Sequence, residues 1–183
     1  MYFLDEKANL EDPEKYNLCP ALTFNMARPN LEFAKESGIA LRGHTLAWHN
    51  QTPFWFFKKD YSMDMEAPFA DRETMLARLE SYIKGVLEFV QTEYPGVIYA
   101  WDVVNEAIME DGSYRKSKFY EILGEEFIPL AFQYAHEADP NAELYYNDYN
   151  EWHKGKVETV VKLIADLKSR GIRIDGMGLQ THV

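Results

Sequence analysis

Asn105 and Glu106 stand at the end of an apolar run and could supply general acid–base chemistry. The run covers residues 97–104 (VIYAWDVV), in which β-branched and aromatic residues predominate. Such a composition predicts a buried parallel strand, with the amide and the carboxyl group at its carboxyl end. In barrels built of alternating strands and helices, catalytic residues lie at that end. A carboxyl group beside a hydrogen-bonding amide is suited to act as a general acid.

A second interpretation of Glu106 is structural. A carboxylate in the first turn of a helix is stabilised by the helix macrodipole. Side chains alternate along a strand, so strict alternation would send Asn105 and Glu106 to opposite faces. Both can face a substrate only if the strand ends or bulges at this point. The sequence leaves the two interpretations open.

The segment 42–51 (RGHTLAWHNQ) ends another predicted strand and carries two histidines and an indole. Alternation places His44 and Trp48 on one face and His49 on the other. His44 and His49 would therefore point apart, and we expect no metal site. The functional interpretation is a pocket lined by His44 and Trp48, with Gln51 nearby. The alternative is a core histidine whose ring bonds backbone groups.

Two further strand ends are rich in groups that bond hydroxyls. The segment 145–152 (YYNDYNEW) contains three tyrosines and two asparagines. The alternative interpretation is that Asn147-Asp148 forms a turn. The segment 176–182 (GMGLQTH) places Gln180 and His182 two positions apart and therefore on one face.

The predicted strand ends thus combine amides, aromatic rings and imidazoles. Such ends converge on one rim of a β/α barrel, where the loops that follow the strands build the site. Amide and imidazole groups bond hydroxyls, and indole and phenol rings cover the apolar faces of sugars. This content predicts a site for a polyhydroxylated neutral ligand.

The elements that would carry these ends repeat the order helix, glycine or proline break, strand. The predicted helices run from Thr23 or Asn25 to Lys35 and over 72–92, 120–138 and 156–169; the predicted strands cover 39–46, a run from Val97, 143–146 and 172–180. The first two dozen residues are polar, contain two prolines and are expected to form a loop. Strands that alternate with helices of this length imply an α/β fold with a parallel sheet or barrel.

The chain has 183 residues, enough for one domain with a hydrophobic core, and a net charge of -11. This charge argues against nucleic acid, which needs clustered Lys and Arg, and against an anionic membrane surface. No run approaches the roughly 18 apolar residues of a membrane-spanning helix. The single cysteine, Cys19, has no histidine near it in sequence, and we do not expect it to be a nucleophile. The first fifteen residues lack the pattern of a signal peptide, so we expect an intracellular chain or one whose leader was removed or not included.

At these residues the chain resembles the family 10 glycoside hydrolases, the retaining endo-β-1,4-xylanases. RGHTLAWHNQTPFWFF resembles the family's third-strand signature, WDVVNEAI its acid/base signature, YYNDYN its fifth-strand signature and GMGLQTHV its sixth. Their order and spacing match across nearly all of the chain. The resemblance implies part of a TIM (β/α)8 barrel, with about four βα units that cover the third to sixth strands in one domain, residues 1–183.

The resemblance also implies roles for single residues. Glu106 resembles the general acid/base, and Asn105 resembles the amide that contacts the sugar 2-hydroxyl beside the scissile bond. His44 and Trp48 resemble residues that line the subsite of the cleaved sugar. The other matches are Gln51 on the glycone side, Tyr149 on the aglycone side, and Gln180 with His182, the pair that orients the nucleophile. No metal or organic cofactor is implied.

The sequence departs from the family pattern at the nucleophile. The family uses a glutamate on its seventh strand in a Thr-Glu context, whereas Thr92-Glu93 here lies at a predicted helix end. The first two strands, with their sugar-binding residues, are not represented either. We therefore expect the nucleophile to lie beyond the end of this chain. Asp148 is not favoured as a substitute, because a role in a turn accounts for it.

Three functions follow as expectations. The first is a xylanase that acts on xylan and xylo-oligosaccharides and whose remaining strands lie outside this chain. The second is a non-catalytic fragment or weak sugar-binding module, and the third an unrelated barrel enzyme acting on a different neutral sugar. The open sheet edges of a half-barrel would permit self-association. The resemblance implies a protein that is secreted.

Overall fold

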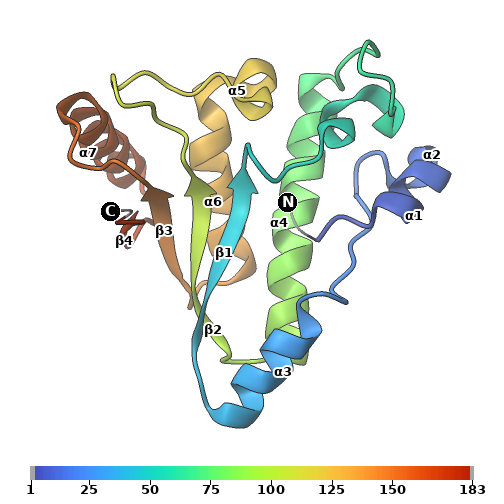
Figure 1. Ribbon diagram of the computed structural model, residues 1–183, viewed down its shortest axis with the longest axis horizontal. Helices are drawn as coiled ribbons and strands as arrows, with labels where there is room; N and C mark the ends of the chain where they lie inside the picture. Colours follow the sequence, from blue (N-terminus) through green and yellow to red (C-terminus); the bar gives the residue numbers. More distant parts are fainter. Residues whose placement is uncertain (1–2, 182–183) are drawn as a thin grey trace.

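The computed structural model describes residues 3–181. At its centre is a parallel four-stranded sheet in the order β1-β2-β3-β4. The strands are β1 (Leu41–Trp48), β2 (Ile98–Asn105), β3 (Glu143–Asp148) and β4 (Gly176–Leu179). All four run in the same direction, so their carboxyl ends lie at the same end of the sheet (Figure 1). Parallel neighbours need long crossover connections, and helices supply them here.

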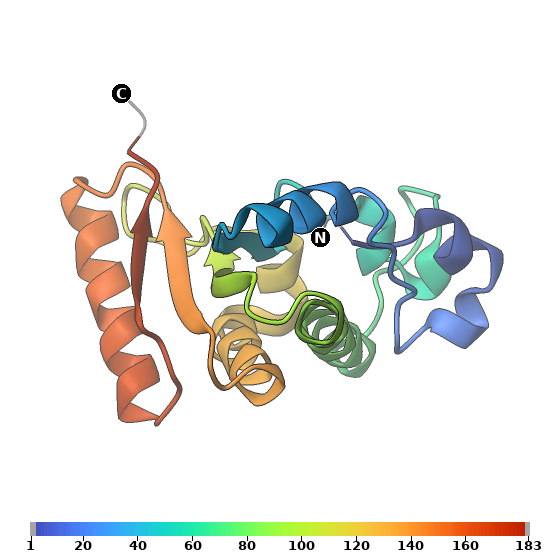
Figure 2. The ribbon, with the colours of Figure 1, turned by 90° about the horizontal axis from the view of Figure 1, so that it is seen from below.

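The helices that follow the strands cover the outer face of the sheet. Figure 2 shows α4, α6 and α7 arranged around this face, and α4 packs against α6. The long helices are α3 (Arg28–Ser37), α4 (Arg72–Glu93), α6 (Phe127–Ala138) and α7 (Lys154–Ser169), with a short α5 (Lys118–Leu123) before α6. The arrangement is that of a partial β/α barrel and confirms the predicted fold class. None of the helices within residues 3–181 combines the length and apolar character needed to cross a bilayer.

Helix α4 shows how the sequence specifies these elements. Asp71 caps it by accepting a hydrogen bond of 2.7 Å from the backbone N–H of Thr74. Its apolar side chains recur at helical spacing, and Met75, Leu79 and Ile83 are fully buried. These side chains belong to the main hydrophobic core, which also contains buried apolar residues of β1, β2 and β3.

The prediction of a loop at the N-terminus is wrong. Residues 6–11 and 13–16 form α1 (Glu6–Glu11) and α2 (Pro13–Tyr16). The side chains of Asp5 and Asp12 accept hydrogen bonds from the first turns of these helices, a capping signal that the prolines and polar composition obscured.

Three other element predictions need correction. Helix α3 starts at Arg28, after a turn, so neither Thr23 nor Asn25 caps it. The predicted helix 120–138 is divided into α5, the 3-10 turn η3 (Gly124–Glu126) and α6, because Gly124 adopts φ 71 and ψ -162. Strand β4 is shorter than predicted and starts only at Gly176.

The aromatic loop after β1 folds back into the core. It forms the 3-10 turns η1 (Phe54–Phe57) and η2 (Lys59–Tyr61). Trp55, Phe56 and Phe57 are at most 3% exposed. These rings therefore pack the interior and are unavailable to a sugar.

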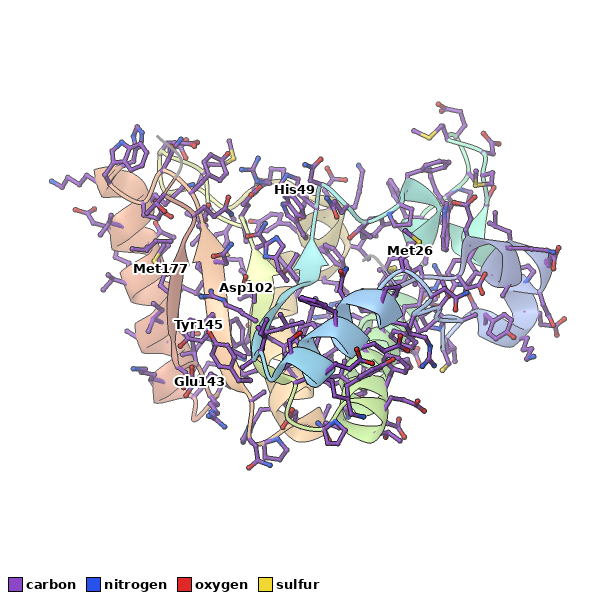
Figure 3. All side chains as sticks on the ribbon, turned by 60° about the horizontal axis from the view of Figure 1, so that its bottom comes forward. Met26, His49, Asp102, Glu143, Tyr145 and Met177 are labelled. Atoms are coloured by element: carbon purple, nitrogen blue, oxygen red, sulfur yellow. The ribbon has the colours of Figure 1, made fainter. Side chains whose placement is uncertain are left out.

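The concave face of the sheet carries polar and charged residues. Arg42 forms an ion pair with Asp102, and its guanidinium carbon lies 4.3 Å from the centre of the Tyr145 ring. Figure 3 shows Asp102 and Tyr145 on neighbouring strands, with Glu143 towards the opposite end of the sheet from His49.

An apolar hollow of about 430 Å³ lies between α7 and the open edge of β4. Trp152, Val161 and Leu179 line it and are 65%, 59% and 58% exposed. Exposed apolar surface beside an unpaired strand is a site where another chain segment can add. Self-association through this edge therefore stays a prediction.

Close packing between β1 and β2 generates a first prediction. A Cβ atom added at Gly43 would overlap the ring of Trp101, which is itself 2% exposed. We expect Gly43→Ala to lower the free energy of unfolding by roughly 1–3 kcal/mol, as overpacked cores do. Chemical denaturation measures this difference.

The matched control is Gly85→Ala in α4. There the added Cβ meets only the end of the Leu22 side chain, at 2.8 Å, and a helix gains stability when glycine becomes alanine. Gly85→Ala should be neutral or stabilising. Equal destabilisation by the two variants would contradict the packing of Gly43 against Trp101.

Candidate active site

Glu106 lies directly beyond the last residue of β2. Its φ is 56°, so the strand ends at Asn105 and the chain turns sharply. The next helix does not begin until Lys118, which rules out the interpretation of Glu106 as a helix N-terminal carboxylate. Because of this turn, the side chains of Asn105 and Glu106 do not point to opposite faces as they would in a continuous strand, and one side-chain amide reaches both of them. The Nε2 of Gln180 lies 3.1 Å from Oδ1 of Asn105 and 3.0 Å from Oε1 of Glu106.

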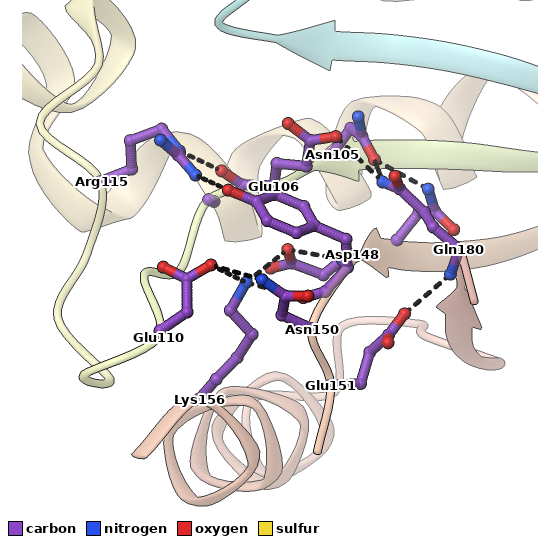
Figure 4. Close-up of polar contacts among 12 residues, drawn as sticks. Asn105, Glu106, Glu110, Arg115, Asp148, Asn150, Glu151, Lys156 and Gln180 are labelled. Atoms are coloured by element: carbon purple, nitrogen blue, oxygen red, sulfur yellow. Dashed lines mark hydrogen bonds and ion pairs between the residues drawn. The ribbon is translucent and has the colours of Figure 1, made fainter. Parts of the chain in front are cut away.

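Residues from three strand ends meet at the Glu106 carboxylate. The indole N–H of Trp48, at the end of β1, donates to Oε2 of Glu106 at 2.9 Å. The amide of Gln180, just past β4, donates to the other oxygen. Figure 4 shows Gln180 and Asn105 beside Glu106. The predicted convergence of Trp48, Glu106 and Gln180 is thus present, and the carboxylate accepts through both oxygens.

Asn105 is a buried amide with one group left for a ligand. It is 2% exposed, and its Oδ1 accepts hydrogen bonds from Asn147, at 2.8 Å, and from Gln180. Its Nδ2 has no hydrogen-bond partner within the part of the chain that the structure describes. A buried N–H without an acceptor is costly, and a ligand hydroxyl at this position would satisfy it.

His44 is held by a carboxylate. Its Nδ1 lies 2.9 Å from Oδ2 of Asp102, which is 4% exposed and also pairs with Arg42. The carboxylate accepts a hydrogen bond from the Nδ1–H of His44 and leaves Nε2 available to a ligand. The His44 and Trp48 rings meet edge-to-face with centres 5.8 Å apart, as expected for one pocket. The alternative of a core histidine bonded to backbone groups is wrong.

Tyr149 and Gln51, two further predicted site residues, are less buried than Asn105. Tyr149 is half-buried, and its hydroxyl accepts a hydrogen bond of 3.1 Å from Arg115. Gln51 lies exposed in the bend after β1. His182 lies outside the described residues.

Asp148 is a fully buried member of an ion pair. It accepts hydrogen bonds from Lys156, at 2.9 Å, and from the backbone N–H of Tyr149, at 2.8 Å. Burial raises the pKa of the Asp148 carboxyl, and these hydrogen bonds oppose that shift. The predicted turn is therefore only part of its role, and a carboxylate with these partners is unsuited to attack a sugar.

Sequence reasoning missed several residues that organise the site. Arg115 donates through Nε to the backbone carbonyl of Glu106 at 2.7 Å. Asp102 orients His44, and its signal was a charged residue inside an otherwise apolar strand. Lys156 carried no comparable signal, because a lysine in the first turn of a helix is ordinarily solvated. Among residues 3–181, no group of three or more His, Cys, Asp or Glu side chains is placed to hold a metal ion.

Comparison with known proteins identifies the family of this chain. The sequence profile of Glycosyl hydrolase family 10 matches residues 7–183. The chain belongs to this family. Membership of family 10 is incompatible with the alternative of an unrelated barrel enzyme.

Relatives within family 10 are similar over the full length of the chain. Endo-1,4-beta-xylanase B of Butyrivibrio fibrisolvens is 56% identical over 185 residues, which cover 100% of this chain and 28% of that protein. A putative endo-1,4-beta-xylanase of Caldicellulosiruptor saccharolyticus is 49% identical, with 100% and 57% covered. The chain thus spans between about a quarter and three-fifths of these two relatives.

Solved structures of family members share the fold. An intracellular xylanase from Thermoanaerobacterium saccharolyticum superposes with a TM-score of 0.82 at 41% identity, covering 88% of this chain and 50% of that one. The Clostridium thermocellum xylanase 10B, solved with xylohexaose, gives 0.82 at 38% identity, covering 91% and 35%. Mutants of the T. saccharolyticum enzyme were solved with xylotriose and xylotetraose.

His49 generates a prediction about pH. It lines a small hollow with Glu106 and Arg115, where burial and then the positive charge of Arg115 lower the pKa of His49 from its ordinary 6.5, while Glu106 opposes the shift. A histidine whose pKa is lower in the folded state stabilises the fold above about pH 6.5, and this contribution is lost as the pH falls through the folded-state pKa. His49→Gln should therefore lose less thermal stability between about pH 7.5 and about pH 5 than the wild type.

The control is His153→Gln, since His153 is exposed. Thermal melts at both pH values should show the wild-type pH dependence in this variant. Identical pH dependence in the His49 variant and the wild type would contradict the proposed environment of His49.

Proposed function

We propose that this chain supplies the acid/base side of a retaining endo-1,4-β-xylanase, with Glu106 as general acid and then general base. The observation that carries the proposal is the meeting of Trp48 and Gln180, from opposite edges of the sheet, at the two carboxylate oxygens of Glu106. The family 10 relatives from B. fibrisolvens and C. saccharolyticus, a xylanase and a putative xylanase, support the substrate class.

The chemistry follows from the position of this carboxyl group. The protonated Glu106 gives its proton to the glycosidic oxygen as the bond to the sugar breaks and a second carboxylate, the nucleophile, bonds the same sugar carbon as an ester. The hydrogen bonds that Trp48 and Gln180 donate to the two oxygens of Glu106, at 2.9 and 3.0 Å, would stabilise the carboxylate that results. In the second step Glu106 takes a proton from water, which attacks the sugar–enzyme ester.

Retention requires a second carboxyl about 5–5.5 Å from the first, as the nucleophile. Asp148 is the carboxyl group at the end of β3, and its ion pair with Lys156 occupies it. We therefore propose that a glutamate beyond Val183 is the nucleophile. Gln180 and His182 would orient it.

The remaining polar groups would bind the sugar chain. The free N–H of Asn105 and Nε2 of His44 would bond hydroxyls of the cleaved sugar, and the Trp48 indole would line its subsite. Gln51 would contact the glycone and Tyr149 the aglycone. Xylo-oligosaccharides bound to similar enzymes support this ligand class. Secretion stays a prediction of the family resemblance, and the similar T. saccharolyticum enzyme is described as intracellular.

A second candidate function is a non-catalytic sugar-binding module. The burial of Asp148 in an ion pair with Lys156 favours it for the chain of 183 residues alone, because this carboxyl group is then not available as the nucleophile. The two candidates differ in whether added sequence restores hydrolysis.

A chimera tests the catalytic proposal. This chain replaces the matching segment of the B. fibrisolvens xylanase, and the product should cleave xylan. In the chimera, Glu106→Gln should slow cleavage of xylan by about 10²–10⁴-fold, the range for a lost general acid. The first step with an activated aryl glycoside should persist, because its leaving group needs no proton. Reducing-sugar release and aryl-group release measure the two reactions.

The matched control is Glu143→Gln, at the opposite end of the same sheet, which should leave both activities unchanged. Equal losses on both substrates in the Glu106 variant would assign Glu106 a structural role. A folded chimera without activity would favour the binding module.

The isolated chain provides a further prediction. Without the proposed nucleophile it should release no reducing sugar from xylan, yet xylotriose should perturb the Trp48 signal in a nuclear magnetic resonance spectrum. Hydrolysis by the isolated chain would show that another carboxyl group, or a partner chain, completes the site.

Self-association of the isolated chain is a separate prediction. Sedimentation at increasing concentration should reveal it. Leu179→Glu at the exposed β4 edge should weaken the association, and Phe33→Glu on α3 should leave it unchanged.

A further inference from the structure

The backbone around Glu106 is held at every polar group by four hydrogen bonds. The N–H of Glu106 donates to the carbonyl of Asn147 at 2.9 Å, and its carbonyl accepts from Nε of Arg115 at 2.7 Å. The N–H of Ala107 donates to the hydroxyl of Tyr146 at 3.1 Å. The carbonyl of Ala107 accepts from the backbone N–H of Arg115 at 2.8 Å. Two of the four bonds therefore depend on side chains.

These bonds stabilise a conformation that Glu106 would not adopt alone. Its φ of 56° lies in the left-handed region, which is unfavourable for a residue with a Cβ. Such a conformation persists only where the surroundings fix it. The position of the carboxyl group thus depends on the groups that hold this turn.

The hydroxyl of Tyr146 contacts the buried ion pair of Asp148 and Lys156. The Tyr146 hydroxyl donates to Oδ2 of Asp148, whose Oδ1 accepts from Nζ of Lys156, and all three side chains are fully buried. A phenol has one proton. Because this proton is donated in the hydrogen bond to Asp148, the lone pairs of the Tyr146 oxygen face the N–H of Ala107. Burial first, and then the charge of Asp148, raise the pKa of Tyr146 well above its ordinary value, so the phenol stays protonated.

The same side chains hold Tyr149. Its backbone N–H donates to Asp148 at 2.8 Å, and its carbonyl accepts from Nζ of Lys156 at 2.8 Å. Its hydroxyl accepts from Nη2 of Arg115, the side chain that also bonds the carbonyl of Glu106. Figure 4 shows Arg115 and Lys156 on two sides of this cluster.

We propose that Arg115, Tyr146, Asp148 and Lys156 form a support cluster of positioning residues that fixes Glu106 and Tyr149 relative to each other. The inference rests on the proposed function of Glu106 as the acid/base. If Tyr149 contacts the aglycone, the cluster aligns the leaving sugar with the proton it receives. Small misplacements of reacting groups cost large factors in rate.

The test uses the 183-residue chain and the indole N–H of Trp48, which reports the position of the Glu106 carboxylate. The chain has four tryptophans, and Trp48→Phe assigns the signal in a ¹H–¹⁵N spectrum. Tyr146→Phe removes the acceptor for Ala107 with little change in shape. We expect the Trp48 signal to shift and its hydrogen exchange to accelerate by about tenfold, as the carboxylate loses its fixed place.

The matched control is Tyr61→Phe, which deletes an equally buried hydroxyl, one that donates to the carbonyl of Tyr16 at 2.6 Å. It should lower stability without moving the Trp48 signal. Arg115→Met is the second variant, for a less buried residue, in case Tyr146→Phe does not fold. Arg115→Lys keeps the charge and should recover part of the wild-type signal.

An unchanged Trp48 signal in folded Tyr146→Phe or Arg115→Met would overturn the proposal. So would an equal shift in the Tyr61→Phe control, because the effect would then be one of general stability. This readout needs no hydrolysis and separates the two proposals. If the signal shifts but Glu106→Gln in the chimera cleaves xylan normally, the support cluster stands and the proposed function of Glu106 fails.

In the chimera, Tyr146→Phe gives the catalytic counterpart of the same test. It should lower kcat on xylan by about 10–100-fold with little change in KM. The sugar-binding contacts remain, but the Glu106 carboxyl group is no longer aligned with the glycosidic oxygen. Unchanged kcat would overturn the positioning role.

Discussion

The left-handed turn at Glu106 is the constraint on which the site depends. A strand that continued through Glu106 would send its carboxyl group away from the amide of Asn105. The turn brings both groups within reach of Gln180, with distances of 3.0 and 3.1 Å. Its conformation is unfavourable in itself, so the polar groups around it must all be paired.

The parallel sheet supplies the partners for this turn. Because all four strands run in the same direction, residues far apart in sequence lie together at the carboxyl end of the sheet. Trp48, Asn147 and Gln180 all approach the end of β2 there. The concave face admits the Arg42–Asp102 pair because β4 carries glycine opposite it. A Cβ at Gly178 would overlap both Arg42 and the amide of Asn147.

Predictions from sequence succeeded where one residue type carries a local signal. The apolar run before Asn105 fixes β2, and helical spacing of apolar residues fixes α4. They failed where two local signals compete, as in α1 and α2, where polar residues and a proline resemble a loop but aspartates cap the helices. The break at Gly124 was missed because one glycine inside a helical pattern is often tolerated.

The sequence by itself determined the α/β class, the strand that ends at Asn105, and the residue types of a sugar-binding rim. Only the tertiary structure decided which of these residues touch. Trp48 and Glu106 lie 58 positions apart in the chain, and their 2.9 Å hydrogen bond exists because β1 pairs with β2 in a particular register. Arg115 and Lys156 reach Glu106 and Tyr149 from a loop and a helix. No local pattern encodes such contacts, because burial and pairing depend on elements that meet only after folding.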